Sequence, residues 1–255
     1  MKQWIPRSYL SFVYFLLYAP IGLLVLYSFN QARFSLIWHG FSLHWYHELL
    51  QDNDLWLALF RSFFLGVTAS VIATFFGTVL CVHLFITQSR PQRSLYAILL
   101  LLIILPDLVL GVALLIFFNL TTIPLGYWSL LIAHVTFCLP FVILTLNARF
   151  HTLDVNLYFS ALDLGATRNK ALVRILLPLL WPAIFSAFLL GFTLSFDDVI
   201  ISYFIAGPDF NILPLTIYSM VRGGVTPELN ALCSLTLLLS MLLVTIAHRL
   251  SRSPS

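Results

Sequence analysis

The sequence predicts an all-α membrane protein with six transmembrane helices, and three observations support this fold class. Of its 255 residues, 60% are hydrophobic and only 9% are charged, against about 25% charged residues in an ordinary soluble domain. The mean hydropathy is +0.98, so one aqueous core cannot hide the apolar surface. The apolar runs are continuous and lack the alternation of a membrane β-barrel, which leaves helices as the spanning elements.

Six apolar segments are each long enough to cross a bilayer, which takes about 20 helical residues. They cover residues 9–29, 63–86, 95–118, 126–147, 182–205 and 229–247. The first segment follows Lys2 and Arg7, as in a secretory signal peptide, but it is longer than such a peptide and no small-residue cleavage site follows Phe29. We expect a retained anchor and a single membrane domain over residues 1–255.

Lysine and arginine residues predict that both termini are cytoplasmic, because cytoplasmic loops of membrane proteins carry the excess of positive charge. With this orientation, ten of the 13 lysines and arginines lie inside: Lys2, Arg7, Arg90, Arg93, Arg149, Arg168, Lys170, Arg174, Arg249 and Arg252. Only Arg33, Arg61 and Arg222 lie in outer loops.

The inner connection over residues 148–181, between the fourth and fifth spans, predicts a short amphipathic helix along the cytoplasmic face. Leu157, Ala161 and Leu164 have the spacing of residues on one side of a helix. Asp154 is a predicted cap for the start of this helix and Gly165 a predicted terminator. Beyond it, Pro178 and Pro182 are predicted to mark the return of the chain into the membrane.

Cysteine and histidine residues within the spans favour packing over chemistry. Cys81, Cys138 and Cys233 lie in apolar runs without the spacing of a disulfide framework or a zinc site. His83 and His134 each stand alone at their level of the membrane, so we interpret them as packing residues. The chain has no glycine-rich phosphate loop of the P-loop type, so we expect no cofactor or metal in it, and any nucleotide hydrolysis belongs to another chain.

Three carboxylates at membrane depth are the main candidates for a transport pathway: Asp107, Asp197 and Asp198. A charge at the centre of a spanning helix costs about 2.5 to 3.5 kcal/mol, so it tends to face a cavity or a partner. At about 1.5 Å per residue, an unbroken helix places Asp107 about 18 Å from Leu95, near the midplane, and Asp197 about 22 Å beyond Pro182.

Adjacent helical residues point about 100° apart, so Asp197 and Asp198 cannot both face one narrow pore in an unbroken helix. One of them is expected to line the path and the other to brace the structure. An alternative is that Asp107 or Asp198 caps a broken helix or pairs with a basic residue of a partner.

The inner connection resembles the EAA loop of permease subunits in ATP-binding-cassette importers. The resemblance rests on Phe159-Ser160-Ala161-Leu162-Asp163-Leu164-Gly165, then nine residues, then Ile175-Leu176-Leu177-Pro178. Phe159-Ser160-Ala161 stands where this family usually has Glu-Ala-Ala, so the acidic first contact is missing. Further stretches are similar to PotC-like permease subunits of spermidine/putrescine importers: residues 106–111, 163–166, 194–199, 207–208, 212–215, 217–221 and 226–231.

This resemblance implies a multi-pass permease subunit of the bacterial inner membrane, with a type-1 transmembrane domain at about residues 63–247. It implies no enzymatic activity in this chain and no nucleic acid partner. The expected partners are membrane lipid, a second, PotB-like permease that completes the pore, a PotA-like ATPase homodimer that binds ATP and magnesium, and a periplasmic PotD-like polyamine-binding protein. The residues it assigns to ATPase coupling are Phe159, Ser160, Ala161, Asp163, Gly165, Ala166, Ile175 and Pro178.

A polyamine is a chain of ammonium groups joined by methylenes, so its pathway needs spaced carboxylates and aromatic faces. The expected pathway residues are Asp107, Asp197, Asp198, Phe196, Tyr203 and Tyr218. The EAA loop reports how transport is driven and not what is carried, so a permease for another small solute remains an alternative. A self-sufficient secondary carrier and an intramembrane enzyme with two aspartates are further alternatives from other functional classes.

Overall fold

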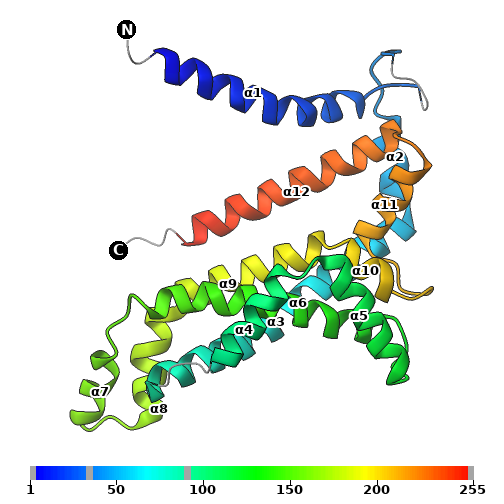
Figure 1. Cartoon of the computed structure of the whole chain (residues 1–255). Coiled ribbons are helices and arrows are strands. Elements are labelled where there is room, and N and C mark those ends of the chain that lie inside the picture. The colour runs from blue at the N-terminus through cyan, green and yellow to red at the C-terminus, as the bar shows by residue number, and fades with distance from the viewer. Residues whose placement is uncertain (1–3, 33–36, 89–92, 252–255) are drawn as a thin grey trace. The chain divides into compact units, whose positions relative to one another are not determined.

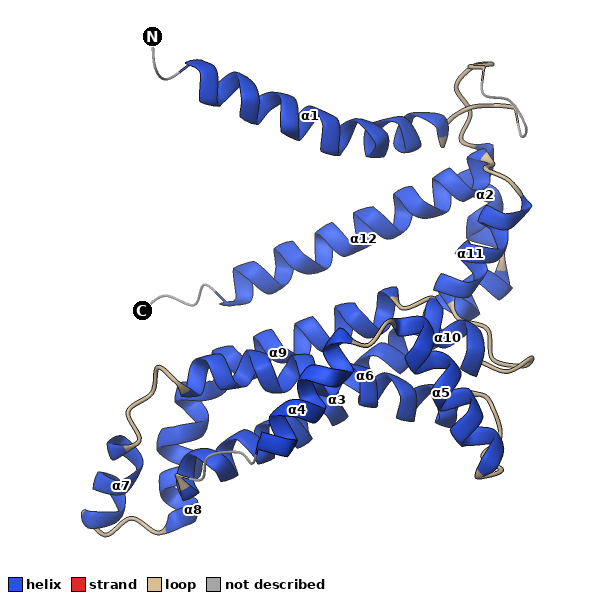
Figure 2. Ribbon diagram, in the orientation of Figure 1, coloured by secondary structure: helices blue, strands red, loops and turns tan. Residues whose placement is uncertain are grey.

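The structure, a computed structural model, describes residues 4–32, 37–88 and 93–251. In this part of the chain the regular elements are helices, as Figure 2 shows, and the only β pairing is an isolated bridge between Asn30 and Phe41. The predicted all-α class is therefore confirmed. The chain divides into two compact units: Met1–Leu57 with Thr216–Ser255 forms unit 1, and Ala58–Leu215 forms unit 2.

Unit 2 is a bundle built around two long helices that run side by side, α6 and α9 (Figure 1). Its elements are α3 (Asn53–Thr87, from Ala58 onward), α4 (Arg93–Ile104), α5 (Asp107–Leu120), α6 (Tyr127–Phe150), α7 (Asn156–Asp163), α8 (Arg168–Ala171), a π-helical turn (Leu172–Leu176), α9 (Leu177–Asp197) and α10 (Ile200–Ile205). Helix α10 packs against α5. Within this unit, α7 and α8 lie at one end of the α6–α9 pair, and α5 and α10 lie at the other (Figure 1).

Two apolar clusters hold unit 2 together. One surrounds α10 and includes Phe118, Leu130 and Ile201, and the other joins α6 to α9 through residues such as Val142 and Leu180. Glycines allow the helices to approach closely, as small residues do in membrane bundles. A Cβ atom on Gly77 would lie 2.7 Å from Val142 Cγ1, and one on Gly111 would lie 3.3 Å from Ile201 Cα.

Unit 1 contains α1 (Trp4–Tyr27), α2 (His44–Gln51), the start of α3, most of α11 (Leu213–Gly223) and α12 (Pro227–Ser251). Both α1 and α2 pack against α12. Buried Asn30 organises the connection between α1 and α2. Its main-chain oxygen accepts a hydrogen bond from Trp45 Nε1 at 2.8 Å, and its Oδ1 accepts one from the His39 N–H at 2.9 Å.

Four described helical stretches are long and apolar enough to cross a membrane: Ser8–Tyr27, Asn53–Thr87, Tyr127–Phe150 and Arg168–Asp197. A fifth is formed if Ala97–Ile104 and Asp107–Leu120, bent by 108°, count as one broken span. The apolar part of α12, Pro227–Leu242, is shorter than these stretches. The described part of the chain thus has four or five candidate spans, and the six-span topology stays a prediction.

The structure corrects the predicted unbroken helix over residues 95–118, which instead bends by 108° between α4 and α5. The break is at Leu105 and Pro106. Proline has no N–H to donate and disfavours helical geometry in the residue before it. The depth of Asp107 counted along a straight helix is therefore wrong, because Asp107 begins a new helix.

The boundaries predicted for residues 182–205 are wrong at both ends of the span. The helix starts at Arg168, passes without a break through Pro178 and Pro182, and ends at Asp197, before the separate α10. The two prolines therefore do not mark the entry into the span.

A π-helical turn explains how the helix tolerates Pro178. The Leu177 N–H bonds to the carbonyl of Leu172, five residues back. Pro178 has no N–H for the carbonyl of Arg174, and in a regular α-helix its ring would clash with that carbonyl. One wider turn before the proline relieves the clash.

Candidate functional site

The break between α9 and α10 is organised by the carboxylate of Asp198. This residue has an extended backbone, with φ −69° and ψ 123°, directly after α9. Its side chain accepts hydrogen bonds from the Ile201 N–H at 3.3 Å, the Ser202 N–H at 2.8 Å and the Ser202 hydroxyl at 2.8 Å. The first N–H groups of a helix have no carbonyl partner within it, so a carboxylate there satisfies them and complements the helix dipole. Asp198 thus caps a broken helix, which was one of the alternatives left open by the sequence.

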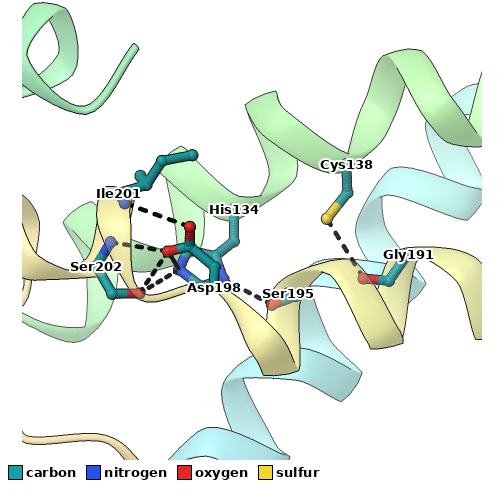
Figure 3. A network of polar contacts seen from close by, with 7 residues as sticks. All are labelled: His134, Cys138, Gly191, Ser195, Asp198, Ile201 and Ser202. Atoms are coloured by element: carbon teal, nitrogen blue, oxygen red, sulfur yellow. Dashed lines mark hydrogen bonds and ion pairs between the residues drawn. The ribbon is translucent and has the colours of Figure 1, made fainter. Parts of the chain in front are cut away.

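A buried histidine on α6 joins the two sides of this break (Figure 3). His134 Nδ1 lies 2.6 Å from Ser195 Oγ on α9, and its Nε2 lies 3.0 Å from Ser202 Oγ on α10. The same Nε2 is 3.7 Å from Asp198 Oδ2. Because the Ser202 hydroxyl donates to Asp198, its oxygen is left to accept a hydrogen bond from His134 Nε2–H.

The interpretation of His134 as alone at its level is therefore wrong, although it does pack as a buried, hydrogen-bonded residue. We call His134, Ser195, Asp198 and Ser202 the hinge network. The sequence gives little indication of this network. Ser195 lies three residues before Asp198 and Ser202 four residues after it, and His134 precedes Ser195 by about sixty residues. No periodicity links such distant positions.

Asp197, the last residue of α9, is exposed, whereas its neighbour Asp198 is buried. The side chain of Asp197 makes no hydrogen bond or ion pair with any residue that the structure describes. The ring of Phe196 stacks on Phe192 with centroids 5.5 Å apart, and Phe192 meets Phe63 edge-on at 5.7 Å. Asp197 thus directly follows, in the sequence, a residue whose ring belongs to a row of three aromatic side chains.

The other predicted pathway residues are placed differently. Asp107 starts α5 half-buried, and its side chain has no hydrogen bond or ion pair within residues 4–32, 37–88 and 93–251. Tyr203 on α10 is 54% exposed and meets Phe204 edge-on. Tyr218 belongs to unit 1, where the Arg222 guanidinium lies 5.8 Å from the centre of its ring. Unit 2 thus contains Asp107, Asp197, Asp198, Phe196 and Tyr203.

At the opposite end of unit 2, the predicted short helix is confirmed as α7, with its cap and terminator. The Asp154 carboxylate accepts a hydrogen bond from the Asn156 N–H at 2.9 Å. Gly165 has φ +88°, and the N–H groups of Gly165 and Ala166 bond back to the carbonyls of Leu162 and Ala161. This pair of bonds is a Schellman motif, which ends the helix at a glycine in the left-handed region.

One face of α7 is packed and the other is open. Ala161 is buried with Tyr158 and Ala171, and the partly buried side chains of Ala166 and Ile175 pack against the same cluster. The exposed residues of α7 and its C-cap are Asn156, Leu157, Phe159, Ser160, Asp163 and Leu164, and Pro178 farther along is exposed too. Of the three residues predicted to lie on one side of this helix, Ala161 is buried and Leu157 is exposed, whereas Leu164, just past the end of the helix, is 90% exposed.

Comparison with known proteins gives three kinds of similarity, the first from a family profile. The family described as "Binding-protein-dependent transport system inner membrane component" matches residues 85–253. Among curated relatives, the chain is 41% identical over 245 residues to the spermidine/putrescine transport system permease protein PotC of Escherichia coli (strain K12), covering 96% of this chain and 93% of that protein. It is 37% identical over 228 residues to the putrescine transport system permease protein PotI of the same strain, covering 87% and 81%.

The fold also has a solved counterpart. A chain in the crystal structure of a bacterial ABC transporter involved in the import of the acidic polysaccharide alginate superposes with a TM-score of 0.75. The match covers 96% of this chain and 94% of that chain at 15% sequence identity. At this identity the likeness concerns the fold alone.

Proposed function

The chain belongs to the family of binding-protein-dependent transport system inner membrane components, and from this premise we propose that it is the permease subunit of an ATP-driven polyamine importer. Members of this family are multi-pass transport subunits of the inner membrane and not enzymes. The observation that carries the proposal is the 41% identity to a spermidine/putrescine permease across 96% of the chain.

A polyamine is favoured over another solute by the chemistry at the end of α9. Asp197 offers a carboxylate that no described residue neutralises, and Phe196 and Phe192, on the same last turns of α9, offer stacked rings. Ammonium groups bind carboxylates, and they also bind the faces of aromatic rings. The fold by itself does not select the solute, because its solved counterpart takes part in the import of an acidic polysaccharide.

Within the pathway, Asp197 is proposed to contact the solute, and Asp107 to supply a second carboxylate from the start of α5. Phe196, Tyr203 and Tyr218 are proposed to supply the aromatic faces. Asp198 is proposed to brace the break between α9 and α10, because three hydrogen bonds already engage its carboxylate.

Coupling to ATP hydrolysis is proposed to pass through α7 and the turn that follows it. Phe159, Ser160 and Asp163 are exposed for contact with an ATPase, and Ala161 anchors the helix to the bundle. Gly165 and Ala166 end the helix firmly, and Ile175 and Pro178 carry motion into α9. A helix fixed at both ends transmits a rotation better than a loop. Phe159, which stands where the family usually has a glutamate, is proposed to make an apolar contact with the ATPase in place of an ionic one.

The proposed assembly has this chain as half of a pore, completed by a second, PotB-like permease in membrane lipid. A PotA-like ATPase homodimer holds ATP and magnesium, and a periplasmic PotD-like protein delivers the polyamine. The proposed transmembrane domain covers about residues 63–247 of the single membrane domain 1–255. Six spans, with both termini cytoplasmic, follow if the broken pair α4–α5 and the helix α12 each count as one crossing.

Uptake of labelled spermidine tests the proposal in cells that lack their own polyamine import and express this chain with its neighbouring transporter subunits. Asp197→Asn is expected to lower ATP-dependent uptake by at least about tenfold, since a lost charge-assisted contact is worth about 1.5 to 3 kcal/mol and each 1.4 kcal/mol is a factor of ten. Asp54→Asn, which neutralises an exposed carboxylate at the start of α3, is the matched control. An assembled complex that hydrolyses ATP without taking up spermidine or putrescine would rule out the polyamine assignment.

A further inference from the structure

We propose that His134 is a positioning residue for transport: by bonding to Ser195 and Ser202 it holds the break between α9 and α10, and so sets the direction in which Asp197 points. This inference rests on the proposed role of Asp197 and adds a residue from a different helix to it. Four features of the hinge network support it.

The first feature is that the bond from His134 crosses the break. Ser195 lies two residues before the end of α9, and Ser202 is the third residue of α10. The histidine ring bonds to both, at 2.6 Å and 3.0 Å, from a third helix, α6 (Figure 3). A single rigid ring therefore fixes the distance between two helical segments that share no continuous backbone ladder.

The second feature is the way the polar groups satisfy one another. The Ser202 hydroxyl donates to Asp198 Oδ2, and the Ser202 oxygen accepts from His134 Nε2–H. The other ring nitrogen accepts from the Ser195 hydroxyl, so the chain of bonds runs from Ser195 through His134 and Ser202 to Asp198. Ser195 and Ser202 each lose a hydrogen-bond partner if the histidine is removed, and an unpaired polar group in a buried site is costly.

The third feature is burial. His134 and Ser202 are fully buried, and Ser195 and Asp198 are 3% and 8% exposed. The solute therefore does not reach His134 directly in this conformation, and its influence on transport passes through the backbone that it holds.

The fourth feature is the position of Asp197. It is bonded covalently to Asp198, and its own side chain has no partner in the described part of the chain. With no bond of its own, its direction is set by where α9 stops. The hinge network determines that point, because it fixes Ser195 before the aspartate and Asp198 directly after it.

A double-mutant cycle on uptake tests the inference in the full transporter complex. We expect His134→Ala and Asp197→Asn each to lower uptake by about tenfold, and the double variant to lose no more than Asp197→Asn alone, because His134 acts through that carboxylate. A double variant whose loss is the product of the two single losses would overturn the inference. An Asp197→Asn variant with normal uptake would instead overturn the proposed pathway role itself, so the two failures are distinct.

Two further variants separate positioning from folding. His134→Gln keeps one acceptor and one donor on a similar amide, and it is expected to restore most of the uptake. Cys138→Ala is the matched control, because Cys138 lies one turn along α6 and bonds to the Gly191 carbonyl of α9 at 3.4 Å without crossing the break (Figure 3). A loss in Cys138→Ala equal to that in His134→Ala would contradict a special role for the break.

If His134→Ala does not assemble with its partner subunits, Ser202→Ala takes its place in the same double-mutant cycle on uptake. It removes only the hydroxyl that links His134 to Asp198. The expected result is again a double variant with Asp197→Asn that is no worse than Asp197→Asn. Independent losses would overturn the inference here too.

Discussion

At the scale of single residues, the two adjacent aspartates show how little the type of a residue says about its role. Asp198 is buried and accepts three hydrogen bonds, whereas Asp197 is exposed and its side chain bonds to no described residue. The sequence indicated that the pair would divide its roles but not which residue would take which. The division depends on whether the helix stops between them.

Asp198→Asn is predicted to destabilise the protein, and Asp197→Asn is predicted to leave its stability unchanged. The Ile201 and Ser202 N–H groups bond to different oxygens of the carboxylate, so an amide at position 198 would accept from one of them and turn its NH₂ group toward the other. Leaving a buried donor unpaired costs about 1 to 3 kcal/mol. Thermal unfolding of the purified complex measures the difference, and equal midpoints for the two variants would contradict it.

Gly77→Ala is predicted to destabilise the α3–α6 contact, because its new Cβ atom would lie 2.7 Å from Val142 Cγ1. Overpacking of this kind costs about 1 to 3 kcal/mol. The same thermal measurement is made on the double variant Gly77→Ala/Val142→Ala, which removes the clashing methyl group. The double variant is expected to recover part of the loss, and failure to do so would mean that the contact is not the cause.

At the scale of elements, α7 and the π-helical turn are the two features that local sequence explains best. Asp154 and Gly165 bound α7 through backbone hydrogen bonds that their residue types favour. Pro178 accounts for the wide turn before it. The break after α9 is different, because no proline or glycine stands there. The contacts found at this break are the hydrogen bonds of Asp198 to the start of α10 and those of His134 to serines on both sides.

Gly165→Ala is predicted to loosen the end of α7. Nothing lies within 4 Å of a Cβ atom built there, so the whole effect comes from the left-handed φ of +88°. That conformation costs an ordinary residue about 1 to 2 kcal/mol. Hydrogen exchange at the Ala166 amide is expected to rise, and the number of polyamines moved per ATP to fall. Gly165→Asn, which tolerates this conformation better, is expected to have a milder effect, and equal effects would contradict the backbone explanation.

Pro178→Ala is predicted to convert the π-helical turn into regular α-helix, because residue 178 regains an N–H for the Arg174 carbonyl. In this variant, the new amide hydrogen of residue 178 is expected to exchange more slowly than the amide hydrogens of its exposed neighbours. Pro182→Ala is the matched comparison, since Pro182 lies within the same helix and follows no such turn. Unchanged protection around Leu172–Leu176 in the Pro178 variant would mean that the turn has another cause.

At the scale of the whole molecule, composition indicated a membrane protein, and the continuous apolar runs, which lack the alternation of a barrel, indicated a helical one. The interruptions were harder to predict. Pro106 marks the break between α4 and α5 and was present in the sequence, but hydropathy averages over it. The hinge network could not be predicted from the sequence, because His134 is distant from Ser195 and Ser202 and none of these residue types by itself indicates a buried network.

The six-span topology is predicted to place residues 120–126 and 207–212 outside and residues 148–181 inside the cell. Alkaline phosphatase fused after Pro208 is expected to be active, since this enzyme requires the oxidising outer compartment. The same enzyme fused after His151 or near the C-terminus is expected to be inactive. An active C-terminal fusion would show that α12 does not cross the membrane.

The π-helical turn at Leu172–Leu176 has a further consequence for how this helix can change. One wide turn is equivalent to a single-residue insertion in a regular helix, which rotates everything before it by about 100° relative to everything after it. Arg168 and Lys170, which lie before the turn, are thereby rotated about the helix axis relative to the apolar surface of α9. Deleting one residue of the turn would rotate the basic end by about 100° and bring back the clash between Pro178 and the carbonyl four residues before it.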